Sequence, residues 1–182
     1  MEMFCCQRCG ACCRKESVSG ESRFFAHLFD FEASRLRKIA ATLGIALRLK
    51  PFLVLQDAFS ERGIVVFYEF DHGDCPFYDN GCRIYDSRPL VCRAFPVLRT
   101  EPFFASPACP AVAAVSGDPA VAFGSSFSAC REMDSAAVML KEKVASLAER
   151  GVLQLCNDRK FDELVDLSDF LKEHSGDSPV EY

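Results

Sequence analysis

The cysteines constrain this chain more than any other feature of its sequence. There are eleven among 182 residues, and nine of them fall into two groups that lie far apart in the sequence. The first group is Cys5, Cys6, Cys9, Cys12 and Cys13, and the second is Cys75, Cys82, Cys92 and Cys109. Cys130 and Cys156 lie outside both groups. We expect the fold to bring loops from the two groups together.

The length of the chain bears on what these cysteines do. Such a cysteine density in a small secreted domain indicates a disulfide framework, but a chain of 182 residues with 49% hydrophobic residues can bury a core of its own. The odd number of cysteines would leave one thiol unpaired, and residues 1–8 lack the apolar segment of a secretory signal. In a reducing cytoplasm the same density indicates metal or redox chemistry. We therefore expect a cytoplasmic metal-binding protein.

Charge and hydropathy argue against two other kinds of partner. Acidic residues outnumber basic ones by 26 to 21, which gives a net charge of −5. Domains that bind nucleic acids usually carry a basic excess, so we expect no nucleic-acid partner. The apolar stretches are shorter than the roughly 18 residues that a membrane-spanning helix needs, so we expect no membrane partner either.

Two overlapping Cys-x2-Cys pairs lie near the N-terminus. Cys6 and Cys9 form one pair, and Cys9 and Cys12 form the next. Structural zinc sites commonly draw their four ligands from pairs with this spacing, and the glycine at position 10 suits a tight turn at the sulfurs. Cys75 and Cys109 are each followed by proline, as in the ligand runs of bacterial ferredoxins. The pattern indicates thiolate ligation without separating zinc from an iron–sulfur cluster.

The adjacent residues Cys12 and Cys13 limit how a single ion could be bound. Neighbouring side chains point in opposite directions in an extended chain and about 100° apart in a helix, so such a pair rarely shares one ion. Eight thiolates are also twice the number that one zinc ion takes. Two sites with four ligands each fit this count, and so does one iron–sulfur cluster with some cysteines left over.

Other side chains near the second cysteine group are candidates for a supporting role. Arg83, Arg88 and Arg93 could offset the negative charge of metal-bound thiolates and donate hydrogen bonds to them. The alternative is that they are ordinary surface arginines. His72 lies near Cys75 and could be a further ligand or a proton carrier, although a solvated turn explains it more simply.

The full cysteine pattern resembles that of a known family. Cys6-x2-Cys9-Gly-x-Cys12-Cys13, followed by Cys75-Pro, Cys82, Arg88-Pro-Leu-Val-Cys92 and Cys109-Pro, is similar to the signature of the CxxCxxCC family of zinc- or iron-chelating proteins, often called YkgJ-type cysteine-cluster proteins. The resemblance covers residues 4–112. It implies a metal site whose ligands are Cys6, Cys9, Cys12, Cys13, Cys75, Cys82, Cys92 and Cys109. We expect the others, Cys5, Cys130 and Cys156, to be buried or idle thiols.

The resemblance implies a metal site and no single agreed reaction. Some relatives are described as flagellin lysine N-methylases, and many others only as iron–sulfur oxidoreductases. The sequence lacks phosphate-binding glycine motifs and a glycine-rich turn of the kind that S-adenosylmethionine sites commonly use. One alternative to a metal-binding protein is an iron–sulfur-dependent enzyme or enzyme component, either redox or protein-lysine N-methylase-like. Another is an interaction module that docks a protein partner, so enzymatic activity stays open.

Hydrophobic patterns predict an α+β fold. Residues 30–41 predict an amphipathic helix with Asp30 as its N-cap and Gly44 as its end. Residues 52–55 and 64–70 predict two strands. Residues 71–110 are rich in Gly and Pro and predict loops, and residues 111–131 predict a linker with one helical turn. We therefore expect a small cysteine-rich metal-binding domain of short strands and loops in residues 1–131.

Residues 132–182 predict a C-terminal helical hairpin packed on this domain. Apolar residues recur at helical spacing from Ala137 to Ala148, and Gly151 ends the pattern. A second helical pattern includes Phe161, Leu164 and Leu171.

Overall fold

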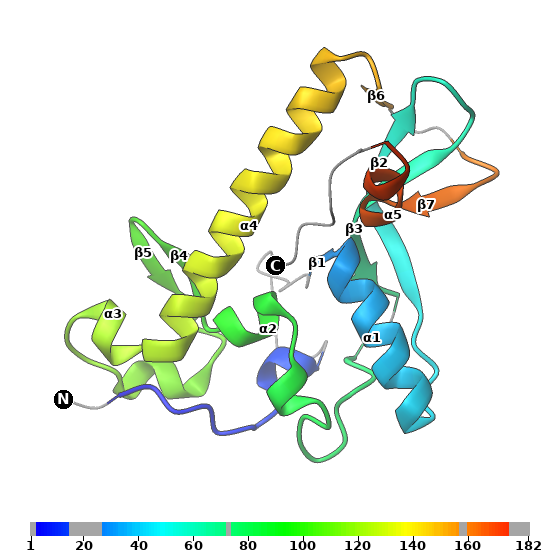
Figure 1. Ribbon diagram of the computed structural model, residues 1–182. Helices are drawn as coiled ribbons and strands as arrows, with labels where there is room; N and C mark the ends of the chain where they lie inside the picture. The colour runs from blue at the N-terminus through cyan, green and yellow to red at the C-terminus, as the bar shows by residue number, and fades with distance from the viewer. Residues whose placement is uncertain (1–2, 15–26, 72–73, 157–159, 175–182) are drawn as a thin grey trace.

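The computed structural model describes residues 3–14, 27–71, 74–156 and 160–174, and it has the α+β fold that the sequence predicts (Figure 1). A hairpin of β2 (Leu49–Asp57) and β3 (Gly63–Phe70) forms the centre of the main sheet. These strands contain both predicted segments and extend beyond the first. Three short strands complete the sheet: β1 (Leu28–Phe29) and β7 (Leu164–Asp166) pair with β3, and β6 (Leu153–Leu155) pairs with β2.

Helix α1 (Asp30–Leu43) confirms the first predicted helix. Gly44 ends it in the left-handed conformation, with φ of 66°, as expected for a helix C-terminus. Asp30 is not the N-cap, because Phe29 occupies that position. The Asp30 carboxylate instead accepts a hydrogen bond from the Ser168 amide, and the Glu32 carboxylate accepts one from the amide of Phe29. The acidic side chain that accepts a hydrogen bond from the N-cap amide of α1 is therefore Glu32.

The region after β3 consists of short elements, as its Gly and Pro content predicts. They are η3 (Tyr85–Ser87), α2 (Leu90–Ala94), a hairpin of β4 (Val97–Thr100) and β5 (Phe103–Ala105), η4 (Pro110–Ala114) and α3 (Pro119–Ala122). Residues 111–131 are more ordered than the expected linker, since they include parts of η4, α3 and α4. The Asp118 carboxylate caps α3 by accepting hydrogen bonds from the amides of Ala120 and Val121.

Two helices lie near the C-terminus of the chain, in rough agreement with the predicted hairpin. Helix α4 (Gly124–Glu149) runs from the α3 end of the molecule toward β6, and α5 (Leu167–His174) follows β7 (Figure 1). The second helix is shorter than its pattern suggests, because Leu164 lies in β7 and pairs with Gly63. Helix α4 crosses the boundary expected between residues 131 and 132, and that division into domains stays a prediction.

Gly63 lies where β7 and the residues before it pack against β3. A Cβ atom at Gly63 would lie 2.7 Å from the side chains of both Phe161 and Leu164. The missing side chain therefore leaves room for these two apolar residues against the end of β3. The helical periodicity could not reveal this contact, because the partner strand is distant in the sequence.

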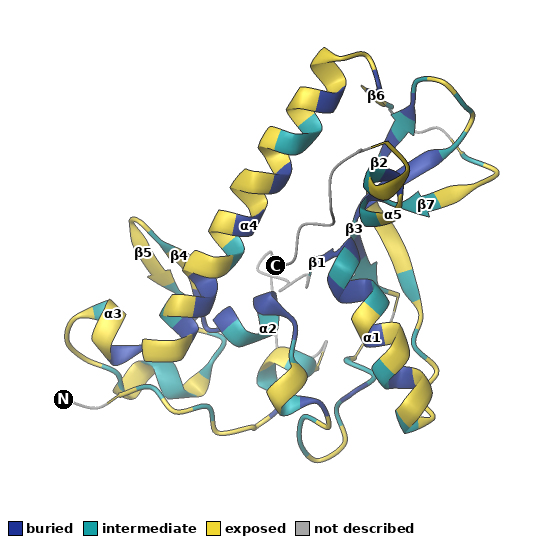
Figure 2. Cartoon of the chain, viewed as in Figure 1, coloured by how far each residue is buried: buried dark blue, intermediate teal, exposed yellow. Residues whose placement is uncertain are grey.

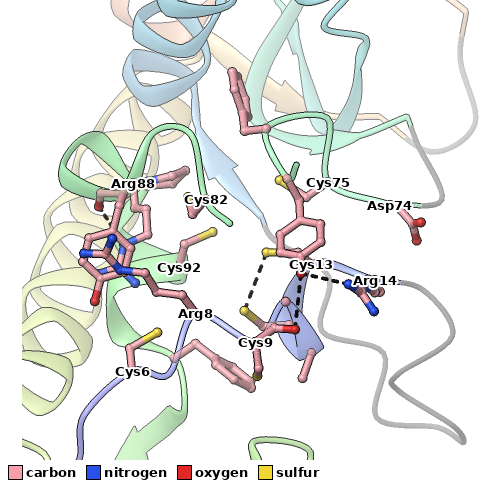
Figure 3. Close-up of a pocket in the computed structure, with 18 of the residues that line it drawn as sticks. Cys6, Arg8, Cys9, Cys13, Arg14, Asp74, Cys75, Cys82, Arg88 and Cys92 are labelled. Carbon is pink, nitrogen blue, oxygen red and sulfur yellow. Dashed lines mark hydrogen bonds between the residues drawn. The ribbon is translucent and has the colours of Figure 1, made fainter. Parts of the chain in front are cut away.

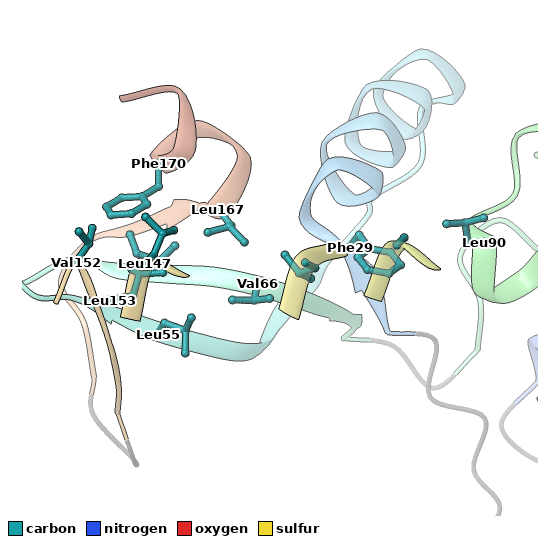
Figure 4. Close-up of a cluster of buried hydrophobic side chains, with 12 residues drawn as sticks. Phe29, Leu55, Val66, Leu90, Leu147, Val152, Leu153, Leu167 and Phe170 are labelled. Atoms are coloured by element: carbon teal, nitrogen blue, oxygen red, sulfur yellow. The ribbon is translucent and has the colours of Figure 1, made fainter. Parts of the chain in front are cut away.

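Three clusters of buried side chains hold these elements together (Figure 2). The first joins the β2–β3 hairpin to α4 and α5 through residues such as Leu55, Val66, Leu147 and Phe170 (Figure 4). The second packs α1 against β3 and against the residues around Phe77, Ile84 and Val91. The third joins α2 and β4 to α3 and α4. Cys75, Cys82 and Cys92 pack against the second cluster, which ties this part of the cysteine-bearing region to α1 and β3. Among the described residues, no helix is long and apolar enough to cross a membrane.

Candidate metal centre

One cavity collects all eight cysteines that the sequence marks as candidate ligands. Its volume is about 470 Å³, and its thiol lining comprises Cys6, Cys9, Cys12, Cys13, Cys75, Cys82, Cys92 and Cys109. Figure 3 shows Cys13 and Cys75 on one side of a common space, with Cys6 and Cys92 on the other. The fold therefore brings the two cysteine groups to the same place.

Gly10 determines how the N-terminal cysteines turn into this cavity. Its φ of 77° is left-handed, and its carbonyl accepts hydrogen bonds from the amides of Cys13 and Arg14 at 2.9 and 3.1 Å. These bonds close the η1 turn (Ala11–Cys13). A Cβ atom at Gly10 would lie only 2.2 Å from the Tyr78 ring. Both the conformation and the close approach require glycine at this position.

Tyr78 and Cys75 join the N-terminal segment to the loop after β3. The Cys75 amide donates a hydrogen bond to the Cys13 carbonyl at 2.7 Å. The Arg14 guanidinium donates one to the Tyr78 hydroxyl oxygen at 2.9 Å and lies over the Tyr78 ring, while that hydroxyl donates to the Cys9 carbonyl at 3.4 Å. Two of these three hydrogen bonds end on backbone carbonyls of the N-terminal segment, so they fix its path beside the second cysteine group.

The second cysteine group lies on tight turns and on α2. Cys82 forms a β-bridge with Tyr78 across a turn in which Asn80 has φ of 50°. Cys92 lies in α2, and Cys109 immediately precedes η4. The turn at Cys82, helix α2 and the start of η4 thus carry three of the ligands predicted from the sequence.

Cys12 and Cys13 have a raised pKa because of neighbouring thiols and burial. The closest pair is Cys12 and Cys13, whose Sγ atoms are 3.8 Å apart. This contact, followed by burial, raises the pKa of Cys12 far above its usual 9.0. The same contact lowers the pKa of Cys13, but the neighbouring Cys75 thiol and burial outweigh it and raise that pKa to about 12. Cys12 and Cys13 are therefore protonated near neutral pH, and a bound cation would be needed to hold these two as thiolates.

Burial also raises the pKa of the thiols in the rest of the second group. It is the main cause for Cys82, Cys92 and Cys109, and the charges of other cysteines add to it in each case. A cluster of thiols that disfavour one another's ionisation is an unfavourable arrangement for thiolates in the protein alone. It is favourable once a soft metal ion neutralises the thiolates.

A comparison with protein families agrees with this donor set. The model of the CxxCxxCC family, described as "Putative zinc- or iron-chelating domain", matches residues 5–110, which is more than half of the chain. This chain belongs to the CxxCxxCC family. No curated protein and no solved structure matches it. The range matched by the CxxCxxCC model contains all eight cysteines that line the cavity.

The arginines near the CxxCxxCC cysteines differ in part from those that the sequence suggests. Arg88 lines the cavity, and its charge acts to lower the pKa of Cys12 and Cys82 against the larger effects that raise it. Arg83 is not among the lining residues, and Arg93 forms an ion pair with Glu132 at 3.0 Å. Of the three suggested arginines, only Arg88 is placed to offset thiolate charge.

Two further arginines of the cavity are absent from the sequence-based candidates. Arg8 and Arg14 both line it, and each adjoins a cysteine of the first group. The Arg8 guanidinium lies 4.1 Å from the centre of the Tyr85 ring, and that of Arg88 lies 3.8 Å from the same centre. Arg8 and Arg14 could have been identified from the sequence, because they lie directly next to Cys9 and Cys13.

The remaining candidates lie elsewhere. Cys5, Cys130 and Cys156 do not line the CxxCxxCC cavity: Cys130 is fully buried, and the Cys156 thiol donates a hydrogen bond to the Val54 carbonyl. Cys5 is exposed. His72 lies outside the described residues.

The donor set fits a thiophilic metal by its chemistry, but its shell is not closed. Within the described ranges, no three His, Cys, Asp or Glu side chains are arranged to hold one ion as they stand. The sulfurs of Cys12 and Cys13 are 3.8 Å apart, which equals the edge of a tetrahedron with metal–sulfur bonds of about 2.3 Å. Adjacent positions in the sequence therefore do not prevent these two thiols from approaching one ion.

Proposed function

We propose that this protein binds zinc or iron through the eight cysteines of its cavity. The observation that carries the proposal is their convergence: residues from two distant groups line one space, and three cysteines outside the family pattern do not. Thiolates are the ligands that favour zinc and iron–sulfur clusters. Arg88, Arg8 and Arg14 support the site by balancing the negative charge of the thiolates.

The thiols of the cavity act on one another in overlapping sets. The charges of Cys9, Cys12 and Cys6 act on the pKa of Cys109. Those of Cys75 and Cys82 act on Cys13 in the same way. Cys12, Cys13 and Cys82 act on Cys92, and Cys12 and Cys6 act on Cys82. Because these sets overlap through Cys6, Cys12 and Cys82, we infer that the eight thiols form one continuous donor set.

Metal content is the experiment that tests this function. Protein purified without oxygen is analysed for zinc, iron and sulfide, and its ultraviolet–visible spectrum is recorded. About two zinc ions in a colourless sample, or iron with sulfide in a brown one, would support the proposal and identify the metal. A fully reduced, folded protein that retains neither metal after exposure to each would contradict it.

An iron–sulfur-dependent enzyme or enzyme component is the second candidate, and the exposure of the site favours it. Cys9 and Cys12 are exposed residues at the cavity, and solvent exposure is one of the factors that set the reduction potential of an iron–sulfur cluster. An exposed cluster is suited to a redox reaction or to protein-lysine N-methylation. Activity is tested by reducing the metal-loaded protein and by assaying methyl transfer from S-adenosylmethionine to candidate proteins. A loaded protein that neither accepts electrons nor transfers methyl groups would favour the binding function alone.

We place the protein in the cytoplasm and expect a protein partner for the second candidate. All eleven cysteines are free thiols, which supports a reducing compartment. Fractionation of cells that express a tagged chain tests the compartment. Affinity capture of the metal-loaded protein tests the partner, with the Cys92→Ser variant as the control for capture that depends on the metal.

A further inference from the structure

Glu32 is a buried carboxylate that links α1 to α2. Its exposed fraction is 2%, and both carboxylate oxygens accept hydrogen bonds from backbone amides. One bond comes from Phe29 at 3.3 Å, and the other comes from Leu90 at 2.7 Å, 58 residues away in the sequence. Phe29 and Leu90 lie at the same end of the buried cluster in Figure 4. Desolvating a carboxylate is costly, so these bonds must compensate for it.

The end of α2 that Glu32 holds is close to a candidate ligand. Leu90 is the first residue of α2, so its amide has no acceptor within the helix. Cys92 follows two residues later and lines the cavity. Arg35, one turn further along α1, donates a hydrogen bond to the Arg88 carbonyl at 3.4 Å. Helix α1 therefore binds the chain on both sides of the N-cap residue of α2.

We propose that Glu32 is a positioning residue for the metal site and fixes Cys92 through the start of α2. This inference rests on the proposed metal binding, and it adds a residue from a helix that carries no cysteine. Glu32 acts through Leu90 and contacts no metal itself. Its contribution is the location of the Cys92 sulfur relative to the other thiols of the cavity.

The charge of Glu32 separates positioning from an electrostatic role. The negative charge of Glu32 lies at the start of α2, against the amide of Leu90, which is two residues before Cys92 in that helix. Charge alone would therefore disfavour the thiolate, and removing it would strengthen metal binding. Removing a bond that positions α2 would weaken metal binding instead. The two roles predict changes of opposite sign.

The matched control for Glu32 is Asp30, a second buried carboxylate on the same turn of α1. Asp30 accepts its hydrogen bond from the Ser168 amide at the start of α5 instead of from α2. Glu32→Gln and Asp30→Asn therefore remove equivalent charges from one helix, but only the first disturbs α2. Glu32→Asp keeps the charge and shortens the side chain by one methylene, so it tests position without electrostatics and also serves if Glu32→Gln does not fold.

Zinc affinity, measured by competition with a chelator, is the first readout. Glu32→Gln and Glu32→Asp should each weaken binding by about 10- to 100-fold, the usual effect of losing a group that orients a ligand. Asp30→Asn should leave affinity within about threefold of the unmodified chain, even if its thermal stability falls as much. Cobalt-loaded Glu32→Gln should lose thiolate-to-metal absorption as Cys92→Ser does, and the double variant should lose little more. Unchanged or stronger binding in both Glu32 variants would overturn the inference.

The reactivity of the Cys92 thiol in metal-free protein is the second readout, and it does not depend on the proposed function. Alkylation at Cys92, followed by mass spectrometry with Cys75 as internal reference, should be several-fold faster in Glu32→Gln than in Asp30→Asn. If the unmodified chain binds no metal, the proposed function fails, and this comparison still decides whether Glu32 holds α2. Equal alkylation rates in the two variants would overturn the positioning role.

Discussion

Replacing Gly10 with alanine should disrupt the candidate metal centre without touching any sulfur. Gly10 has φ of 77°, and a left-handed conformation costs an alanine about 1 to 2 kcal/mol. The added Cβ would also lie 2.2 Å from the Tyr78 ring, which must move. Overpacking of this kind costs about 1 to 3 kcal/mol. The two effects together predict a loss of about 2 to 5 kcal/mol in the metal-loaded protein.

Gly44→Ala provides the matched control for this prediction. Gly44 is also left-handed, with φ of 66°, but a Cβ there meets nothing within 4 Å. Its replacement should cost only the conformational part, about 1 to 2 kcal/mol, and leave metal content unchanged. Urea unfolding of the metal-loaded proteins gives the free energies, and elemental analysis gives the metal content.

The Tyr78 ring supplies a further check on the same reasoning. In a chain that already carries Tyr78→Ala, the additional cost of Gly10→Ala should fall to that of Gly44→Ala, because no ring remains to be displaced. The reasoning would be refuted if Gly10→Ala cost no more than Gly44→Ala in the otherwise unmodified chain, or if both retained full metal content.

Three further predictions concern the thiols and the charges around them. Cys92→Ser should lower metal content and melting temperature together, whereas Cys156→Ser should change neither, as elemental analysis and thermal unfolding would show; equal losses would mean the ligands are misassigned. The pKa of Cys13 is raised from 9.0 to about 12, so the free energy of unfolding of metal-free protein should fall as the pH rises through that interval. Urea titrations in which the free energy of unfolding rises with pH would contradict this prediction. Arg88→Met should weaken zinc binding about tenfold and Arg93→Met much less, because only Arg88 lines the cavity; equal effects in a chelator competition would remove the special role of Arg88.

Much of the site could be predicted from the sequence because the cysteine pattern is local and chemically specific. The eight cysteines of that pattern line one cavity, and Gly10 forms the tight turn that its position suggests. The strands of the central hairpin and helix α1 were also predictable, since their periodicity is carried by neighbouring residues. Such features depend on short-range order that a single sequence contains.

The features that could not be predicted depend on partners distant in the sequence. Leu164 fits a helical pattern, but it lies in a strand that pairs with Gly63. The missing side chain of Gly63 leaves room for Leu164. Glu32 fits the start of a helix, and only the fold reveals that Leu90 shares its carboxylate. Arg14 belongs to the cavity because the Tyr78 ring lies beside it. Each contact joins residues whose proximity is a property of the whole chain.

The two-part construction of the cavity has a consequence for synthesis on the ribosome. Cys13 is made 96 residues before Cys109, the difference between positions 109 and 13, which at typical translation rates is about 5 to 20 s. During this interval the chain carries the N-terminal thiols while the opposite wall of the cavity, which begins at Cys75 and ends at Cys109, is incomplete. The nascent chain must therefore carry unprotected, closely spaced thiols through the cell before it can enclose them. Because the first cysteine group precedes the second along the chain, burial of its thiols depends on the rate of synthesis as well as on the fold.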